Sequence, residues 1–220
     1  MIAVLVLGPP ASGKTTAVRT LVEHSPEVAH FKVREHFAHL LAIDDPVAVE
    51  HREQLRRREV LTDAVVEYAF ADFLRAHAVA RVVLVEGYPR SPTQLADMRR
   101  TLASHGGRMA GAVVFDAPDA ILRARRAGRL ACPRCDHSGV RGQDDSCPRC
   151  GLDLVSRPDD ELTRFEARVA QFRTAGLEVA RLLAAADCVL VDADLPPRAL
   201  ASSLRAAVRG FGTVLKETPR

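Results

Sequence analysis

The sequence predicts an α/β fold, in which a five-stranded parallel β-sheet carries helices on both faces and a small insert holds a metal. Three observations lead to this prediction. Short apolar runs alternate with helix-compatible segments along most of the 220 residues. The first run leads into a glycine-rich loop, and a stretch rich in Cys, Pro, Gly and Asp interrupts the alternation. Strands separated by helices pair in parallel, and a chain of this length buries a proper core.

The first element is an apolar run, Ile2 to Leu7, which leads into the loop GPPASGKTT at Gly8 to Thr16. The pattern G-x-x-x-x-G-K-[ST] joins a parallel strand to a helix in phosphate-binding loops. Its glycines let backbone N–H groups converge on phosphate oxygens, which the positive end of the next helix also faces. Lys14 reaches the outer phosphates, while the Thr15 hydroxyl holds Mg²⁺. We therefore predict a three-layer P-loop NTPase fold.

The alternative is a Gly/Pro turn that holds Gly-Lys-Thr by chance. Lysine occurs only three times in this arginine-rich chain, which disfavours a chance occurrence at the motif position. The residues of the loop that we expect to bind ATP are Gly8, Ala11, Ser12, Gly13, Lys14, Thr15 and Thr16.

The first half of the chain continues the alternation of strand and helix. The loop leads into a helix over about 14–24, and a short strand is predicted over 28–33. Asp44-Asp45-Pro46 then breaks a helical stretch, so we expect several helices before the next strand. These helices are predicted over about 34–42, 47–57 and 61–77.

The second half contains three further strands. An apolar strand at 81–86 ends in the turn Gly87-Tyr88-Pro89-Arg90. The ligand site of a parallel sheet lies at the carboxyl ends of its strands, where this turn and the glycine-rich loop both lie. A long helix is predicted over about 160–185, with Asp159 as its N-cap. The remaining elements are helices over about 93–104, 118–127 and 197–209 and strands over 110–115 and 188–191.

Composition argues against several classes of protein. The net charge is only +3, the arginines are dispersed and aromatic residues make up 5%, so we expect no nucleic-acid partner. No run approaches the ~18 apolar residues of a membrane span, so we expect no membrane partner. The apolar start lacks a basic n-region and runs directly into the phosphate loop, unlike a signal peptide. We expect a cytoplasmic monomer.

The interrupting stretch, residues 129–157, holds two C-P-R-C motifs. Four thiolates delivered as two pairs fit the tetrahedral geometry of structural zinc, and a closed four-sulfur shell leaves no open position for catalysis. The alternative is a pair of redox dithiols, or free cysteines, although paired cysteines in a cytosolic protein favour a metal. Cys188 lies alone in an apolar strand and is expected to be a core residue. The predicted zinc ligands are Cys132, Cys135, Cys147 and Cys150.

Together these motifs resemble the adenylate kinase family of P-loop nucleoside monophosphate kinases, in particular members with a Cys₄ zinc lid. The stretch VLVEGYPRSPTQ (83–94) resembles the family's "DGFPRT…Q", which lines the acceptor site. RRAGR (125–129) resembles the arginine pair that enters the lid, and CGLDLVSRPDDELTRFEAR (150–168) resembles the lid exit. The similarity runs along most of the chain, in order and at matching spacing.

The resemblance implies a division of the chain into three parts. Residues 1–128 and 158–212 would form the kinase core, with an acceptor-binding helical segment over about 32–77. Residues 129–157 would form a zinc-ribbon-like lid, and 213–220 a tail.

The resemblance also implies roles for individual residues. Phosphoryl transfer brings several negative charges together, and arginine grips phosphate oxygens bidentately. The implied catalytic residues are Lys14, Arg90, Arg129, Arg157 and Arg168. Arg125 and Arg129 would join the ATP site, with Arg125 against the donor base. The implied acceptor-binding residues are Arg34, Glu86, Gly87, Arg90, Gln94, Arg157 and Arg168. Thr15 and, through water, Glu86 would hold Mg²⁺. The alternative for any single arginine is a solvated surface residue.

The acceptor segment departs from the family pattern. The run KVREHFA (32–38) stands where the family has "STGDLLR", so Arg34 replaces a glycine and Ala38 replaces a phosphate-gripping arginine. We expect transfer from ATP to AMP or another nucleoside monophosphate. The alternative is a non-AMP acceptor, either a phosphate or a phosphonate. A remote alternative is a zinc-ribbon protein that uses ATP only as a switch.

Overall fold

Five parallel strands form the central sheet, in the order β2-β3-β1-β4-β7. The structure is a computed structural model that describes residues 1–57, 59–135, 137–184 and 187–212. The strands are β1 (Ile2–Leu7), β2 (Val28–Lys32), β3 (Val82–Glu86), β4 (Arg108–Asp116) and β7 (Cys188–Asp192). The predicted five-stranded α/β fold is confirmed. The predicted tail, 213–220, lies outside the described residues.

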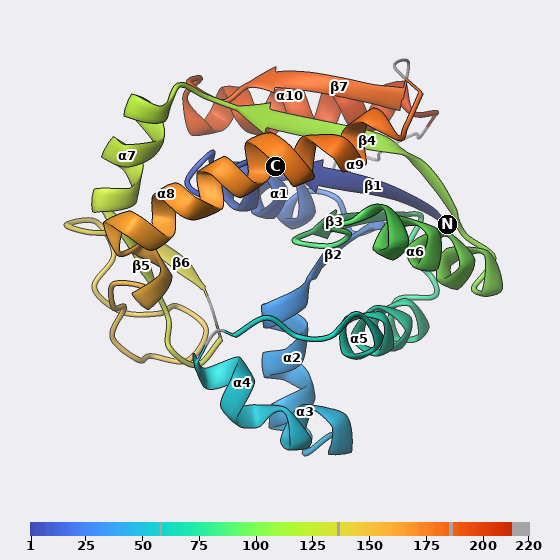
Figure 1. Cartoon of the computed structure of the whole chain (residues 1–220), viewed down its shortest axis with the longest axis horizontal. Helices are drawn as coiled ribbons and strands as arrows, with labels where there is room; N and C mark the ends of the chain where they lie inside the picture. The colour runs from blue at the N-terminus through green and yellow to red at the C-terminus, as the bar shows by residue number, and fades with distance from the viewer. Residues whose placement is uncertain (58, 136, 185–186, 213–220) are drawn as a thin grey trace.

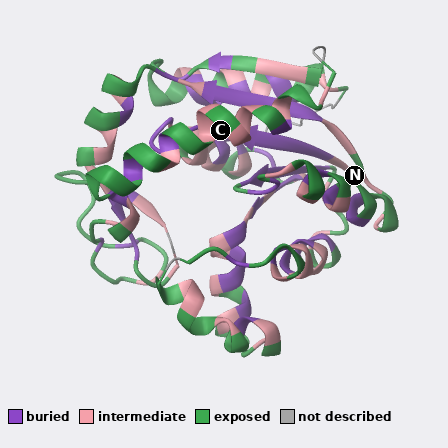
Figure 2. Ribbon diagram, in the orientation of Figure 1, coloured by how far each residue is buried: buried purple, intermediate pink, exposed green. Residues whose placement is uncertain are grey.

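Side chains of each central strand alternate between two apolar layers. In β1, Ala3, Leu5 and Leu7 pack into one layer, whereas Val4 and Val6 pack into the other. This period of two follows from the pleat of a strand. Because helices bury both faces of the sheet, the side chains on both faces are apolar. Figure 2 shows the strands largely buried and the outward faces of the helices exposed.

Helices cover the sheet on both sides, which completes the three layers (Figure 1). One layer is packed by α2 (Val33–Ala42), α5 (Asp63–Ala76), α6 (Pro92–Ser104) and α9 (Leu177–Arg181). The other is packed by α1 (Lys14–Glu23), α7 (Asp119–Ala127), α8 (Leu162–Gln171) and α10 (Pro197–Gly210). No helix in the described part of the chain is long and apolar enough to cross a membrane.

The segment between β2 and β3 forms a helical arm, α2 to α5, beside the sheet (Figure 1). Two short helices, α3 (Pro46–Glu50) and α4 (Arg52–Arg57), connect α2 to α5. The predicted break is present, because the Asp45 carboxylate accepts the Ala48 N–H and Pro46 occupies the first turn of α3.

The cysteine segment, residues 129–157, contains a small antiparallel pair that the sequence did not predict. Its strands are β5 (Arg129–Ala131) and β6 (Ser138–Val140), which follow directly from α7. Cys132 and Cys147 are buried with Leu130 and Leu154 in a separate small core. This core is too small to stabilise a domain by apolar burial alone, which is typical of a segment held by a metal.

The long helix predicted over about 160–185 is divided. A 3₁₀ turn, η1 (Pro158–Asp160), precedes α8, and a π-helical turn, η2 (Phe172–Gly176), separates α8 from α9. The prediction of Asp159 as N-cap was wrong. Glu161 is the N-cap, because its carboxylate accepts the N–H groups of Thr163 and Arg164, whereas the Asp159 carboxylate is bound to Arg168.

Candidate active site at the carboxyl ends of the strands

The glycine-rich loop turns from β1 into α1 with little space for side chains. Gly8 has φ +156°, and a Cβ there would lie 2.7 Å from the Phe115 carbonyl oxygen. Gly13 precedes Lys14 with φ +83°, a conformation that favours glycine. Ala11 and Ser12, between these two glycines, are buried. The loop therefore has the tight backbone that lets N–H groups approach a phosphate closely.

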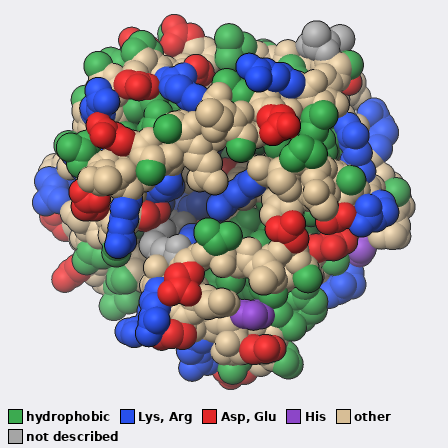
Figure 3. Space-filling model, viewed as in Figure 1, with side chains coloured by type: hydrophobic (Ala, Val, Ile, Leu, Met, Phe, Trp, Pro, Cys, Tyr) green, Lys and Arg blue, Asp and Glu red, His purple; other side chains and the backbone are tan. Residues whose placement is uncertain are grey.

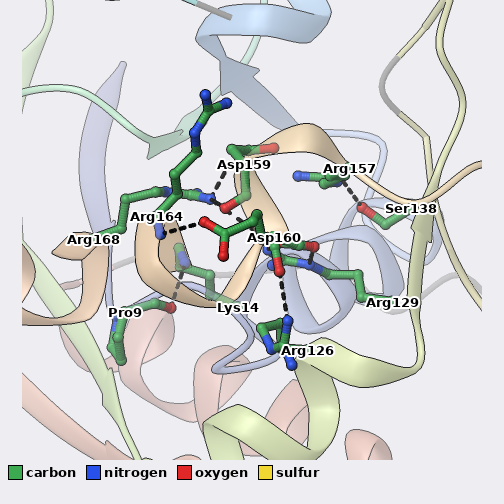
Figure 4. Close-up of polar contacts among 11 residues, drawn as sticks. Pro9, Lys14, Arg126, Arg129, Ser138, Arg157, Asp159, Asp160, Arg164 and Arg168 are labelled. Atoms are coloured by element: carbon green, nitrogen blue, oxygen red, sulfur yellow. Dashed lines mark hydrogen bonds and ion pairs between the residues drawn. The ribbon is translucent and has the colours of Figure 1, made fainter. Parts of the chain in front are cut away.

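Lys14 folds back over its own loop. Its Nζ donates to the Pro9 carbonyl oxygen at 2.9 Å (Figure 4). Burial and the nearby Arg129, Arg168 and Lys32 lower the pKa of Lys14 to about 8, although Glu86 opposes the shift. The structure thus places the ammonium group among several other cations, an arrangement that an anion would stabilise.

Thr15 and Glu86 meet directly, in a position that suits a hard cation. The Thr15 hydroxyl donates to Glu86 Oε1 at 2.6 Å. The second oxygen, Oε2, lies 3.2 Å from His30 Nε2. Burial raises the pKa of Glu86, but His30, Lys14 and Lys32 outweigh it and hold this pKa well below its usual range. A hydroxyl beside an ionised carboxylate is the oxygen donor set that Mg²⁺ prefers, so these residues fit the ion.

Arg90 and Gln94 are connected at the start of α6. The Gln94 amide oxygen accepts the Arg90 backbone N–H at 2.7 Å, and its Nε2 donates to Asp63 Oδ1 at 2.6 Å. Arg90 Nε donates to the Gly87 carbonyl oxygen at 2.8 Å. Desolvation and the charge of Arg168 lower the pKa of Arg90. Arg90 therefore lies within electrostatic reach of the arginines described next.

Four arginines surround an aspartate pair, and we call this group the arginine cluster: Arg126, Arg129, Arg157 and Arg168 with Asp159 and Asp160 (Figure 4). Arg129 pairs through two nitrogens with the Asp160 carboxylate, and Arg126 donates to the Asp160 carbonyl oxygen at 2.7 Å. Arg168 donates to Asp159 Oδ2 at 2.7 Å. Burial and the neighbouring arginines lower the pKa of Arg168, against the effect of the aspartates.

Arg157 contacts the cysteine segment. Its Nη2 donates to the Ser138 Oγ in β6 at 2.9 Å. Figure 4 shows its side chain on the opposite side of the aspartate pair from Arg168. In the space-filling view, the face is hollowed near its centre, and Lys and Arg side chains gather around the hollow (Figure 3).

The contacts of the remaining predicted residues lie outside this cluster. Arg125 donates to the carbonyl oxygens of Ala193 and Asp194, in the turn after β7. Arg34 belongs to α2 of the helical arm, and its Nη1 lies 3.5 Å from the Leu55 carbonyl oxygen in α4. Thr16 is exposed on α1.

The four cysteines of the two C-P-R-C motifs meet in one cluster. Their sulfur atoms all lie within 4.8 Å of one another, with the pairs Cys132–Cys150 and Cys135–Cys147 at 3.3 and 3.4 Å. Tetrahedral zinc with Zn–S bonds of about 2.3 Å places its sulfurs about 3.8 Å apart, so the cluster fits zinc after a small expansion. Burial raises the pKa of Cys147, but backbone N–H groups of Arg149 and Cys150 and the neighbouring thiols bring it down to about 7.

Comparison with known families gives a match over more than half of the chain. The family described as "AAA domain" (AAA_17) matches residues 7–139, which include the phosphate loop, the helical arm and the start of the cysteine segment. The chain belongs to the AAA domain family. Within this P-loop family it is similar to curated adenylate kinases, which confirms the predicted relationship to the adenylate kinase family.

Three of these adenylate kinases show the extent of the similarity. The protein of Novosphingobium aromaticivorans is 24% identical over 176 residues, which cover 77% of this chain and 81% of the relative. That of Carboxydothermus hydrogenoformans is 26% identical over 181 residues, 79% and 84% of the two chains. That of Pyrococcus furiosus is 28% identical over 174 residues, 75% and 76%.

Two features of the site in this family member were missed by the sequence analysis. Arg126 was treated only as part of the motif RRAGR, yet it contacts Asp160 and lies with its Cζ 5.8 Å from the centroid of the Phe165 ring. The partnership of Asp159 and Asp160 with Arg168 and Arg129 was also not predicted. The signal in the sequence was that Asp159-Asp160 follows Arg157 after a single proline.

Proposed function

We propose that this chain is a phosphotransferase of the nucleoside monophosphate kinase type, which moves the γ-phosphoryl group of ATP to a phosphate group on a small acceptor. One observation carries the proposal: Lys14, Arg90 and Arg168 all have lowered pKa values, because burial desolvates them and because other cations lie close to them. Gathering like charges beside a phosphate loop costs free energy unless an anion binds there. Two nucleotides would supply that negative charge.

Each residue then has a proposed part in an in-line transfer. Lys14 and Arg129 would hold the outer phosphates of ATP, while Arg90 would hold the acceptor phosphate. Arg157 and Arg168 would neutralise the charge that develops on the moving phosphoryl group. Positioning and electrostatics supply most of the catalysis in such a reaction.

In the absence of substrates, the aspartate pair neutralises two arginines of the proposed phosphate site. Asp159 and Asp160 satisfy Arg168 and Arg129 in the structure. We infer that incoming phosphates would exchange with these carboxylates, so that the arginines need not be left unpaired in a partly buried site.

The two proposed metals have different purposes. Thr15 and, through water, Glu86 would hold Mg²⁺, whose charge offsets that of the phosphates when it is bound. The four cysteines would hold zinc as a purely structural ion, because a closed four-sulfur shell has no position for a substrate.

We favour a nucleoside monophosphate as the acceptor, with Gln94 and Arg34 in the acceptor site. A non-AMP phosphate or phosphonate is the second candidate, because Ala38 offers no charge and Arg34 is directed to the Leu55 carbonyl oxygen. Losing one arginine–phosphate contact costs about 1.5–3 kcal/mol, which corresponds to roughly one to two orders of magnitude in acceptor affinity.

A coupled ADP-release screen tests both the phosphotransfer activity and the class of the acceptor. The acceptors are AMP, GMP, CMP, UMP, dTMP and a set of non-nucleotide phosphates and phosphonates. A large acceleration by one of them supports phosphotransfer and names its class. Slow turnover that no acceptor accelerates would instead favour an ATP switch.

A double substitution then tests the acceptor segment. If AMP is a poor acceptor, Arg34→Gly combined with Ala38→Arg should restore activity towards AMP, since it returns the family's glycine and arginine. If the wild-type chain already prefers AMP strongly, the changed-acceptor alternative fails.

A further inference from the structure

Glu35, in the first turn of α2, brings together cations from three separate segments. Its Oε1 accepts Arg19 Nη2 of α1 at 2.7 Å and lies 3.6 Å from Lys32 Nζ at the end of β2. The same oxygen lies 3.7 Å from Arg149 Nη1, in the second C-P-R-C motif. The side chains of Glu35 and Arg19 are only 16% and 20% exposed, so this pair interacts with limited screening by water, whereas the Arg149 side chain is 56% exposed.

Arg19 extends this contact to the other half of the cysteine segment. Its Nη1 donates to the Ser138 carbonyl oxygen of β6 at 3.3 Å, while its Nη2 holds Glu35. The hydroxyl of the same Ser138 accepts Arg157 Nη2. A continuous set of contacts therefore runs from the acceptor-binding helix, through α1, to an arginine of the proposed phosphate site.

We propose that Glu35 is a positioning residue that fastens the cysteine segment to the acceptor-binding arm, through Arg149 directly and through Arg19 and Ser138. This inference rests on the proposed function and adds to it the contact that positions Arg157 when the acceptor is bound. In this role Glu35 itself would not contact a substrate.

The electrostatics of Glu35 agree with such a role. Burial opposes ionisation of this carboxyl group, but Lys32 and Arg19 hold its pKa below the ordinary value. Glu35 is therefore an anion at neutral pH. A partly buried carboxylate that loses its charge would leave Arg19 without its charged partner, at a cost well above that of an exposed ion pair.

Arg134, in the first C-P-R-C motif, provides a matched control for substitutions of Arg149. Arg134 occupies the position in Cys132–Cys135 that Arg149 occupies in Cys147–Cys150. Both arginines are exposed, but Arg134 makes no ion pair with the residues that the structure describes. Substituting either arginine removes the same charge from an equivalent turn, and only Arg149 would remove the contact with Glu35.

Hydrogen exchange of the zinc-loaded full chain measures the proposed fastening directly. The variants are Glu35→Gln, Arg149→Gln, their combination and Arg134→Gln. We expect Arg149→Gln to speed exchange in residues 137–155 by about two- to fivefold, as for a half-exposed pair. Glu35→Gln should speed it by about tenfold, since it also removes the charged partner of Arg19.

The decisive outcome is non-additivity. Adding Arg149→Gln to Glu35→Gln should change exchange no further, because the contact is already gone. Zinc content per chain should stay unchanged in all four variants. Additive effects of the two substitutions, or an effect of Arg134→Gln as large as that of Arg149→Gln, would overturn the proposal.

Steady-state kinetics separate this inference from the proposed function. Glu35→Gln should raise the acceptor KM about tenfold while the KM for ATP changes little, and Glu35→Asp, which keeps the charge, should recover part of the loss. Non-additive effects on hydrogen exchange without any acceptor-stimulated ADP release would contradict the proposed function. They would still support the contact that Glu35 makes between the cysteine segment and the acceptor-binding arm. An unchanged acceptor KM in Glu35→Gln would contradict the positioning role of Glu35 without contradicting the proposed kinase function.

Discussion

At the scale of single residues, Lys14 has opposite effects on stability and on activity. Its folded-state pKa of about 8 lies below the ordinary value of 10.5, so at pH 7 the fold retains a charge that it disfavours. Lys14→Met should therefore keep or raise the unfolding midpoint at pH 7, with a gain of up to about 2 kcal/mol. The same change should lower phosphoryl transfer by about 100-fold or more, because a charge aimed at the phosphates is lost.

Thermal unfolding and ADP release of the same preparation check this prediction. Arg198→Met, an exposed change at the start of α10, is the control and should alter neither quantity. A folded Lys14→Met protein with near-normal turnover would contradict the assignment of the phosphate site.

At the scale of elements, the cysteine segment should depend on its metal more than the sheet does. Its separate core holds two leucines and the cysteines, whereas the sheet is packed by large apolar layers. We expect about one zinc per chain, bound by the four cysteines. Chelation should speed hydrogen exchange in residues 129–157 and lower activity while β1 and β4 stay protected.

Elemental analysis and exchange mass spectrometry provide the measurement. Cys188→Ser is a suitable control, since this cysteine lies outside the cluster and donates to the Ala180 carbonyl oxygen. A metal-free protein, or a pair of disulfides in freshly isolated material, would refute the zinc assignment.

The packing of α2 against α5 should weaken on acidification. Burial, together with His39 and His77, lowers the pKa of His36 below its ordinary 6.5, although Asp72 Oδ2, 2.9 Å from its Nε2, opposes this. The unfolded chain therefore binds the proton more readily, so stability falls as the pH drops through 6.5 and stops falling below the folded pKa.

Thermal unfolding between pH 7.5 and 5 tests the contribution of His36. The unfolding midpoint of His36→Gln should fall less over this range than that of the wild-type chain. The exposed His24→Gln should follow the wild-type curve. Parallel curves for all three proteins would show that His36 is not responsible.

At the scale of the whole molecule, the phosphate loop, the turn after β3 and the arginine cluster belong to separate parts of the chain that one ligand would join. Ligand binding should therefore stabilise the fold as a unit. At about 100 times its Kd, Mg-ATP should add about 2.7 kcal/mol, or roughly 5–10 °C in unfolding midpoint. Lys14→Met should show a much smaller shift. An equal shift in the variant would place ATP elsewhere.

Several features of this protein are determined by its sequence alone because they are local. The spacing of GPPASGKTT predicts a strand, a loop and a helix, since it depends on backbone freedom within nine consecutive residues. The alternation of apolar runs predicts the parallel sheet, and each C-x-x-C motif predicts a metal turn. The positions of most strands and helices follow from these local patterns.

Other features were decided only by tertiary structure. Asp159 is suited both to cap a helix and to pair with an arginine, and the position of Arg168 in the fold selects the pair. The contacts of Glu35 with Arg19 and Arg149 join segments 16 and 114 residues apart in the sequence. No local pattern specifies such contacts, because they depend on where the folded chain directs each long, flexible side chain.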